Sequence, residues 1–183
     1  MKRFYFDYAA ATPLDPDAVR AMHAAEAQVG NPSSLHAEGR AMRELLSAAR
    51  KDIAKILNAR DTEIVFTSTA TEANNLAIFG AVTASGDESA EILVAATEHA
   101  AVRRVTDVIR ASGYSCHDIP LTDKGLCDVA ALEKQITDKT VLITLAYVTG
   151  EVGIIQPIGE VGKLVRRVRE DRSARGVATP LLL

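Results

Sequence analysis

The sequence has no long apolar run, which argues against a membrane-spanning helix. No segment of the 183 residues approaches the ~20 consecutive apolar residues that a transmembrane helix needs. Lys2 and Arg3 carry charges, but no long apolar stretch follows them, so no secretory signal is predicted. We therefore expect a cytoplasmic protein that has no membrane partner.

The sequence also has few cysteines and no large excess of acidic or basic residues. The two cysteines, Cys116 and Cys127, have no second Cys or His at metal-ligand spacing, so neither a disulfide framework nor a metal site is predicted. The formal net charge is only -3, and no long run of like charges occurs, which argues against nucleic acid as a partner. The basic cluster of Arg166, Arg167 and Arg169 is interpreted as the solvated face of a helix.

The apolar residues that are present alternate between strand-like and helix-like spacing. Extended segments or strands are predicted at residues 4–8, 63–67, 92–96, 114–119, 140–147 and 180–183. Helices are predicted at residues 16–29, 35–58, 72–82, 100–111, 129–136 and 158–169, with Ser34 as the cap of the second. Strands separated by helices indicate an α/β fold with parallel pairing, whose ligands bind beyond the carboxyl ends of the strands. Because the final segment is the start of an apolar strand, the domain is expected to be incomplete at its C-terminus.

The first candidate segment, Thr67–Asn75, follows a predicted strand and opens a helix. A helix N-terminus offers unpaired N–H groups and the positive end of its dipole, and the hydroxyls of Ser68, Thr69 and Thr71 add donors for a phosphate. Simple N-capping by Thr69 or Thr71 explains the same pattern. Both interpretations stay open at this point.

Two more loops follow predicted strands. His99, in Thr97-Glu98-His99-Ala100, could stack on an aromatic ligand and move protons, or could instead cap a helix. The segment 148–158 contains two glycines and a proline, and could either offer backbone donors or simply connect a strand to a helix. Three loops at consecutive strand ends favour one shared site.

In order along the chain, these segments resemble the class V aminotransferase superfamily and, within it, the cysteine desulfurases. The resemblance spans nearly the whole chain and rests on Phe6–Pro13, Gly30–His36, Thr67–Asn75, Thr97–His99 and Glu151–Ile158. It implies the large domain of the pyridoxal-phosphate (PLP) transferase fold type I, with a mainly parallel sheet and flanking helices. Residues 1–15 would belong to the small domain and residues 16–183 to a partial large, cofactor-binding domain of a homodimer.

The resemblance also assigns roles to residues. Ala70 and Thr71 match the residues that grip the cofactor phosphate, and His99 matches the histidine that stacks on the pyridine ring and assists proton transfer. Gly150 stands where the family has an asparagine near the cofactor's phenolic oxygen. Thr69 stands where the family has a glycine, so a β-branched residue replaces a permissive one.

The implied reaction converts L-cysteine to L-alanine and leaves the sulfur as a persulfide on an enzyme cysteine, for iron–sulfur cluster assembly or another sulfur-acceptor protein. The Schiff-base lysine and the sulfur-accepting cysteine of the family fall after Leu183, so the 183-residue chain alone is expected to be inactive. The alternatives are another class V reaction, such as that of a selenocysteine lyase or an aminotransferase, and a non-catalytic scaffold that keeps the domain.

Overall fold

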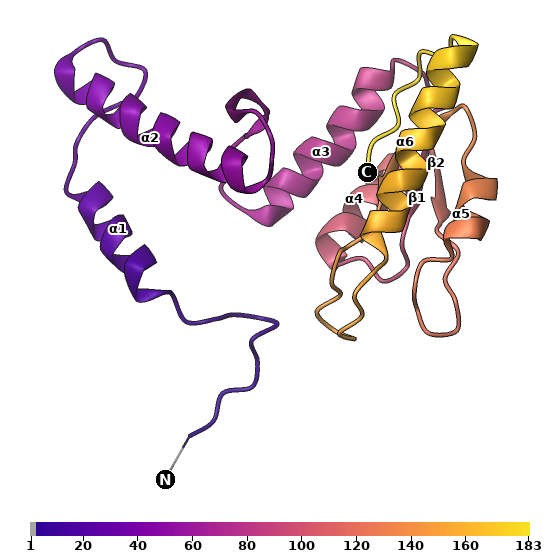
Figure 1. Cartoon of the computed structure of the whole chain (residues 1–183), viewed down its shortest axis with the longest axis horizontal. Coiled ribbons are helices and arrows are strands. Elements are labelled where there is room, and N and C mark those ends of the chain that lie inside the picture. Colours follow the sequence, from indigo (N-terminus) through magenta and orange to yellow (C-terminus); the bar gives the residue numbers. More distant parts are fainter. Residues whose placement is uncertain (1–2) are drawn as a thin grey trace. The chain divides into compact units, whose positions relative to one another are not determined.

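The computed structural model describes residues 3–183, which divide into two compact units at the boundary between Phe66 and Thr67 (Figure 1). The first unit is helical, and the second contains the sheet. The assignment of residues 1–15 to a small domain stays a prediction. No helix of the described residues is long and apolar enough to cross a membrane.

The first unit begins with α1 (Pro16–Glu26), whose start is the one predicted from the sequence. The Asp15 carboxylate accepts a 2.8 Å hydrogen bond from the Asp17 N–H, and Pro16 occupies the first helical position, where its missing N–H costs nothing. The helix ends at Glu26 rather than near residue 29. The predicted cap was therefore confirmed and the predicted end was three residues too late.

The second helix, α2 (Ala37–Ile56), is capped by His36, so the prediction of Ser34 as its cap was wrong. The N–H of Ser34 instead donates to the Asn31 carbonyl at 2.9 Å and closes a turn before the helix. This turn lies against Gly39, where a Cβ would come within 2.6 Å of the Ser34 carbonyl oxygen. The close approach of the turn to the helix requires a glycine there.

The strand predicted at residues 63–67 is absent from the described residues, where a 3-10 turn, η1 (Asp61–Glu63), leads into an irregular segment. The Nε of Arg50 on α2 donates to the Ile64 carbonyl at 3.2 Å, and its guanidinium lies 5.1 Å from the centroid of the Phe66 ring. Ile64 and Phe66 therefore contact Arg50 of a helix rather than pairing in a sheet.

The second unit is α/β, as predicted. Its elements in chain order are α3 (Ala70–Ser85), β1 (Glu91–Val94), α4 (Ala100–Ala111), β2 (Ser115–Asp118), α5 (Val129–Gln135), β3 (Thr140–Thr144) and α6 (Ile158–Arg175). The three strands are parallel and lie in the order β2-β1-β3. The predicted strand at residues 180–183 is reduced to a single parallel bridge between Leu182 and Leu142, on the outer edge of β3.

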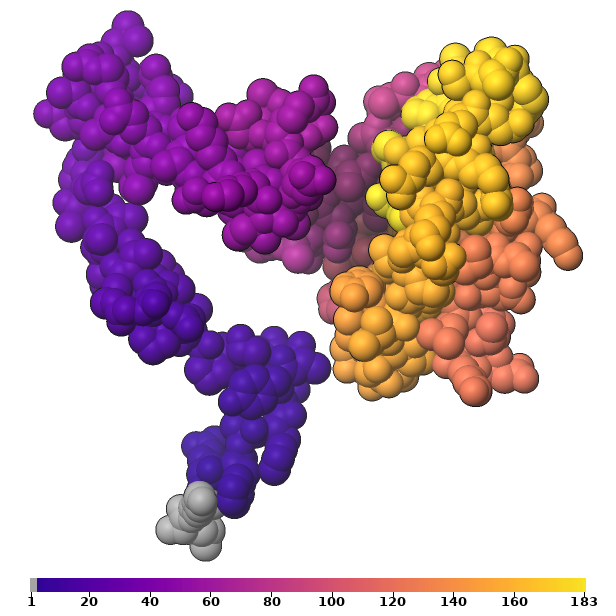
Figure 2. Space-filling model, viewed as in Figure 1, coloured from indigo at the N-terminus to yellow at the C-terminus, as the bar shows by residue number. Residues whose placement is uncertain are grey.

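Both faces of the sheet are covered by helices, as parallel sheets require. On β1, Ile92 and Val94 pack against α3 and α4. Leu93 packs against α5 and α6 on the other face, as does Ala95, the residue that follows the strand. In Figure 2 the yellow α6 segment lies against the orange segment that contains α5. The alternation places two helix pairs on opposite faces of one sheet.

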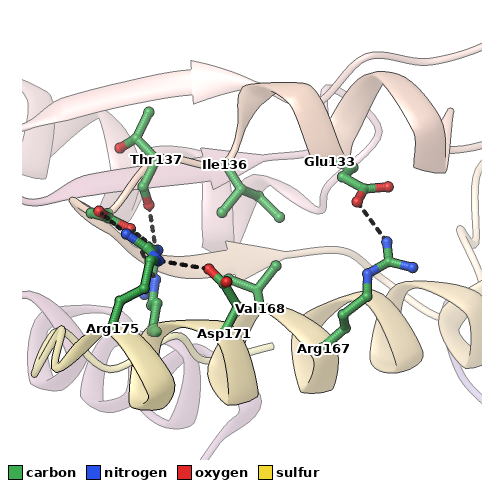
Figure 3. Close-up of a pocket in the computed structure, with 9 residues that line it drawn as sticks. Glu133, Ile136, Thr137, Arg167, Val168, Asp171 and Arg175 are labelled. Atoms are coloured by element: carbon green, nitrogen blue, oxygen red, sulfur yellow. Dashed lines mark hydrogen bonds and ion pairs between the residues drawn. The ribbon is translucent and has the colours of Figure 1, made fainter.

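A hollow of about 350 Å³ lies between α5 and α6, and Figure 3 shows the ion pairs between the side chains that line it. Arg167 bonds Glu133 at 2.6 Å, and Arg175 bonds both Asp138 at 2.7 Å and Asp171 at 2.8 Å. The hydrogen bonds from Arg175 lower the pKa of the Asp138 carboxyl. Because each of these carboxylates already has an arginine, the hollow joins two helices and offers no unpaired carboxylate to a ligand.

Arg172, which the sequence did not single out, is the buried member of this arginine group, with only 2% of its surface exposed. Its guanidinium donates to the carbonyls of Thr137, Thr140 and Thr179, the last two at 2.9 and 3.1 Å. Burial lowers its pKa. One side chain thus ties α6 to the start of β3 and to the C-terminal segment.

Replacing Arg172 by methionine should lower the free energy of unfolding by about 2–3 kcal/mol, because buried carbonyls lose their donors. Urea denaturation monitored by circular dichroism measures the change. Arg166→Met is the matched control, since Arg166 is exposed on the same helix, and should change the stability by less than about 0.5 kcal/mol. Equal stabilities of the two variants would contradict the role given to Arg172.

Candidate functional site

The carboxyl ends of the three strands are fixed to one another by backbone hydrogen bonds. The Ala95 N–H donates to the Thr144 carbonyl at 3.1 Å, and the Ile119 N–H donates to the Val94 carbonyl at 2.9 Å. Residues that follow β1 and β3 therefore leave the same edge of the sheet from defined positions.

The start of α3 leaves two backbone donors free. The Thr69 hydroxyl accepts from the Glu72 N–H at 3.1 Å, and the Glu72 carboxylate accepts from the Ser68 N–H at 2.8 Å. Within the described part of the chain, the N–H groups of Ala70 and Thr71 donate no hydrogen bond. The predicted capping by Thr69 is confirmed, and it leaves unoccupied the two N–H groups that were predicted to hold a phosphate.

Threonine at position 69 fits the backbone without strain. Its φ of -151° and ψ of 158° lie in the extended region, which β-branched residues favour. No left-handed conformation is needed there, so the residue that replaces the family's glycine does not distort the loop. The substitution adds a capping hydroxyl instead.

His99 is the N-cap of α4. Its Nδ1 accepts a 3.1 Å hydrogen bond from the Ala101 N–H, so Nδ1 carries no proton and the neutral ring holds its proton at Nε2. The side chain is otherwise exposed. Helix capping by His99, one of the two predicted roles, is confirmed, and the role in binding a ligand ring stays a prediction.

Thr71 and His99 line one pocket of about 400 Å³ between α3 and α4. Its apolar lining includes Val105 and Val108, and its polar lining includes Asn75 and Arg104. The structure thus brings together two of the predicted site residues, with Ala70 immediately before Thr71. We call this space the α3–α4 pocket.

Asn75 and Arg104 were given no role from the sequence. The Asn75 amide donates to the Thr71 carbonyl at 2.7 Å, one helical turn back. Arg104 lies four residues after Ala100, the first residue of α4, so the two residues are on the same face of this helix. Asn75 follows Thr71, and Arg104 follows Ala100, by four residues. This four-residue spacing could have identified Asn75 and Arg104 as pocket residues once α3 and α4 were known to be neighbours.

Gly150 does not line the α3–α4 pocket. It lies in the exposed turn of a loop that the buried Gln156 anchors, by accepting from the Cys127 N–H at 2.8 Å and donating to the Gly125 carbonyl at 2.9 Å. Glu151, the next residue, lines a separate hollow of about 220 Å³. The role predicted for Gly150 at the cofactor therefore stays a prediction.

The hollow beside Glu151 is acidic. Its other charged lining residue is Glu98, and burial raises the pKa of the Glu98 carboxyl although the N–H groups of Ala146 and His99 oppose that shift. Two carboxyl groups make this hollow unsuitable for an anion.

Neither cysteine has the environment of a sulfur-accepting nucleophile. Burial raises the pKa of the Cys116 thiol on β2, and burial with the nearby Asp128 raises the pKa of Cys127 to about 11. Because the thiolate is the nucleophile, both thiols are suppressed near neutral pH. Cys127 is buried in a loop, and Cys116 lies on β2, within the segment 114–119 that was predicted to be a strand.

Alkylation should show how strongly the Cys127 thiol is suppressed. In the Cys116→Ser variant at pH 8, a thiol of pKa about 11 is only about 0.1% ionised. Iodoacetamide should therefore modify the native chain about 100-fold more slowly than the urea-unfolded chain. Mass spectrometry gives both rates, and similar rates would show that burial does not protect this thiol.

A second prediction concerns the cap at position 99. His99→Ala should lower the free energy of unfolding by about 1 kcal/mol, whereas His99→Asn should keep most of it because asparagine is also a good N-cap. His117→Ala, at an exposed histidine on β2, serves as the control. If the Asn and Ala variants are equally destabilised in urea melts, capping is not what His99 contributes to the fold.

The profile of the class-V aminotransferases matches residues 4–171. The chain belongs to this family. A cysteine desulfurase IscS of Archaeoglobus fulgidus is 35% identical over 162 residues, which cover 88% of this chain and 42% of the relative. The chain thus spans less than half the length of this curated class-V relative.

Solved structures give the fold of this class-V chain. A NifS-like protein superimposes with a TM-score of 0.88 at 27% identity, over 99% of this chain and 48% of that one. A structure described as SspA in complex with cysteine gives a TM-score of 0.83 at 32% identity, over 90% and 48% of the two chains. The predicted PLP-transferase fold and the predicted resemblance to cysteine desulfurases are confirmed.

Proposed function

We propose that this chain carries the phosphate- and ring-binding part of a PLP-dependent cysteine desulfurase. The observation that carries the proposal is the pair of free N–H groups at Ala70 and Thr71, beside a pocket that also contains His99. A phosphate at the start of α3 would accept both hydrogen bonds and would lie at the positive end of the helix dipole.

The chain's own residues would bind and orient the cofactor. The N–H groups of Ala70 and Thr71 and the Thr71 hydroxyl would hold the phosphate, and His99, whose neutral ring carries its proton at Nε2, would contact the ring. The buried Val105 and the exposed Val108 belong to the apolar part of the pocket lining. PLP, when bound, supplies the electron sink that the reaction of an amino acid requires.

The substrate in this proposal is L-cysteine, which becomes L-alanine while its sulfur passes to an enzyme cysteine as a persulfide. The names of the relatives support this reaction, as does the cysteine in the complex of SspA. An iron–sulfur scaffold or another sulfur-acceptor protein would receive the sulfur, and the working form would be a cytoplasmic homodimer. Since the chain spans about 40% of its curated relatives, these features belong to the proposal for the whole protein.

The proposal is tested by nuclear magnetic resonance of the ¹⁵N-labelled chain, titrated with PLP and with pyridoxal. PLP should shift the amide signals of Ala70 and Thr71, whereas pyridoxal, which has no phosphate, should leave them nearly unchanged. Equal responses to the two compounds would rule out a phosphate site at the start of α3.

Ala70→Pro sharpens this test. Position 70 is the first of α3, where proline is tolerated, and Thr69 already has the extended conformation that a following proline requires. Loss of one N–H donor to a charged phosphate should weaken PLP binding about tenfold. Ala37→Pro, at the first position of α2, is the matched control and should leave the affinity unchanged. Unchanged binding by Ala70→Pro would contradict the role of this N–H.

A further inference from the structure

We propose that Arg104 is the phosphate-binding cation of the α3–α4 pocket. This inference rests on the proposed function and deepens it, because it adds a side-chain charge to a phosphate site otherwise made of backbone N–H groups and one hydroxyl. Three observations carry the inference: among residues 3–183, Arg104 has no ion-pair partner and no carboxylate lines the pocket, and Arg104 itself lines the pocket.

Arg104 differs from its neighbours on α4 in having no partner within the described residues. Arg103 lies 3.8 Å from Asp118 and also donates to the Ala96 carbonyl. Arg110 bonds Asp107 at 2.8 Å. The guanidinium of Arg104 is therefore available to a ligand without breaking an existing ion pair.

The position of Arg104 directs its side chain toward the predicted phosphate site. Arg104 follows Ala100 by four residues, a rise of about 6 Å, and helical side chains incline toward the N-terminus of their helix. The long Arg104 side chain thus extends toward the first turn of α4, and it lines the same pocket as Thr71 and His99.

The charged side chain and the helix starts that line the α3–α4 pocket are all positive. Its lining contains no acidic residue, and it includes the first turns of both α3 and α4, each equivalent to roughly +0.5 charge. The hollow lined by Glu98 and Glu151 has the opposite character. A planar guanidinium can bind two phosphate oxygens at once, so a phosphate monoester such as PLP is the ligand class that fits the α3–α4 pocket.

The test compares Arg104→Gln with Arg166→Gln, which removes the same charge from an exposed position on α6, across the sheet. Dissociation constants are measured for PLP, pyridoxal and inorganic phosphate. Arg104→Gln should weaken the binding of PLP and of phosphate about tenfold and leave pyridoxal unaffected. Arg166→Gln should change each constant by less than about twofold.

Two outcomes would overturn the inference: unchanged PLP and phosphate affinity in Arg104→Gln, or an equal loss in Arg166→Gln, which would indicate only overall charge. The amides of Ala70 and Thr71 separate this inference from the proposed function. If PLP shifts these amides equally in the wild type and in Arg104→Gln at equal affinity, the phosphate site stands without Arg104. If inorganic phosphate binding depends on Arg104 while PLP leaves the amides unshifted, the anion site stands and the proposed cofactor site fails.

Discussion

The parallel pairing of β1 with both of its neighbours is the constraint on which the site depends. Parallel strands end at the same edge, and the hydrogen bonds from Ala95 to Thr144 and from Ile119 to Val94 fix that edge. The inward side chains of β1, Ile92 and Val94, then hold α3 and α4 on one face. The starts of both helices line the α3–α4 pocket.

The helix starts in this pocket follow a common rule, in which a side-chain cap satisfies one N–H and leaves others free. Thr69 takes the N–H of Glu72, and His99 takes the N–H of Ala101. Capping and ligand binding were opposed interpretations of these segments in the sequence. In the structure they are compatible at α3, because the capped N–H group of Glu72 is not one of the two proposed to bind a phosphate.

Features with local causes could be predicted from the sequence. The bounds of α4 (Ala100–Ala111) matched the prediction because both of its ends carry signals, a capping residue before it and Gly113 after it. The strand at residues 63–67 failed because Arg50, distant in sequence, holds that segment on a helix. Arg172 and Gln156 were not found, since their burial and their carbonyl partners arise only when separate loops meet.

The cap at His99 also limits its proposed chemistry. A proton added at Nδ1 would remove the acceptor of the Ala101 N–H and would weaken the start of α4. Nε2 is the nitrogen whose proton can be exchanged without disturbing the helix. The hydrogen bond that orients the ring would therefore also decide which ring nitrogen exchanges a proton in the proposed reaction, so the position of His99 and its proposed proton transfer would depend on the same backbone N–H.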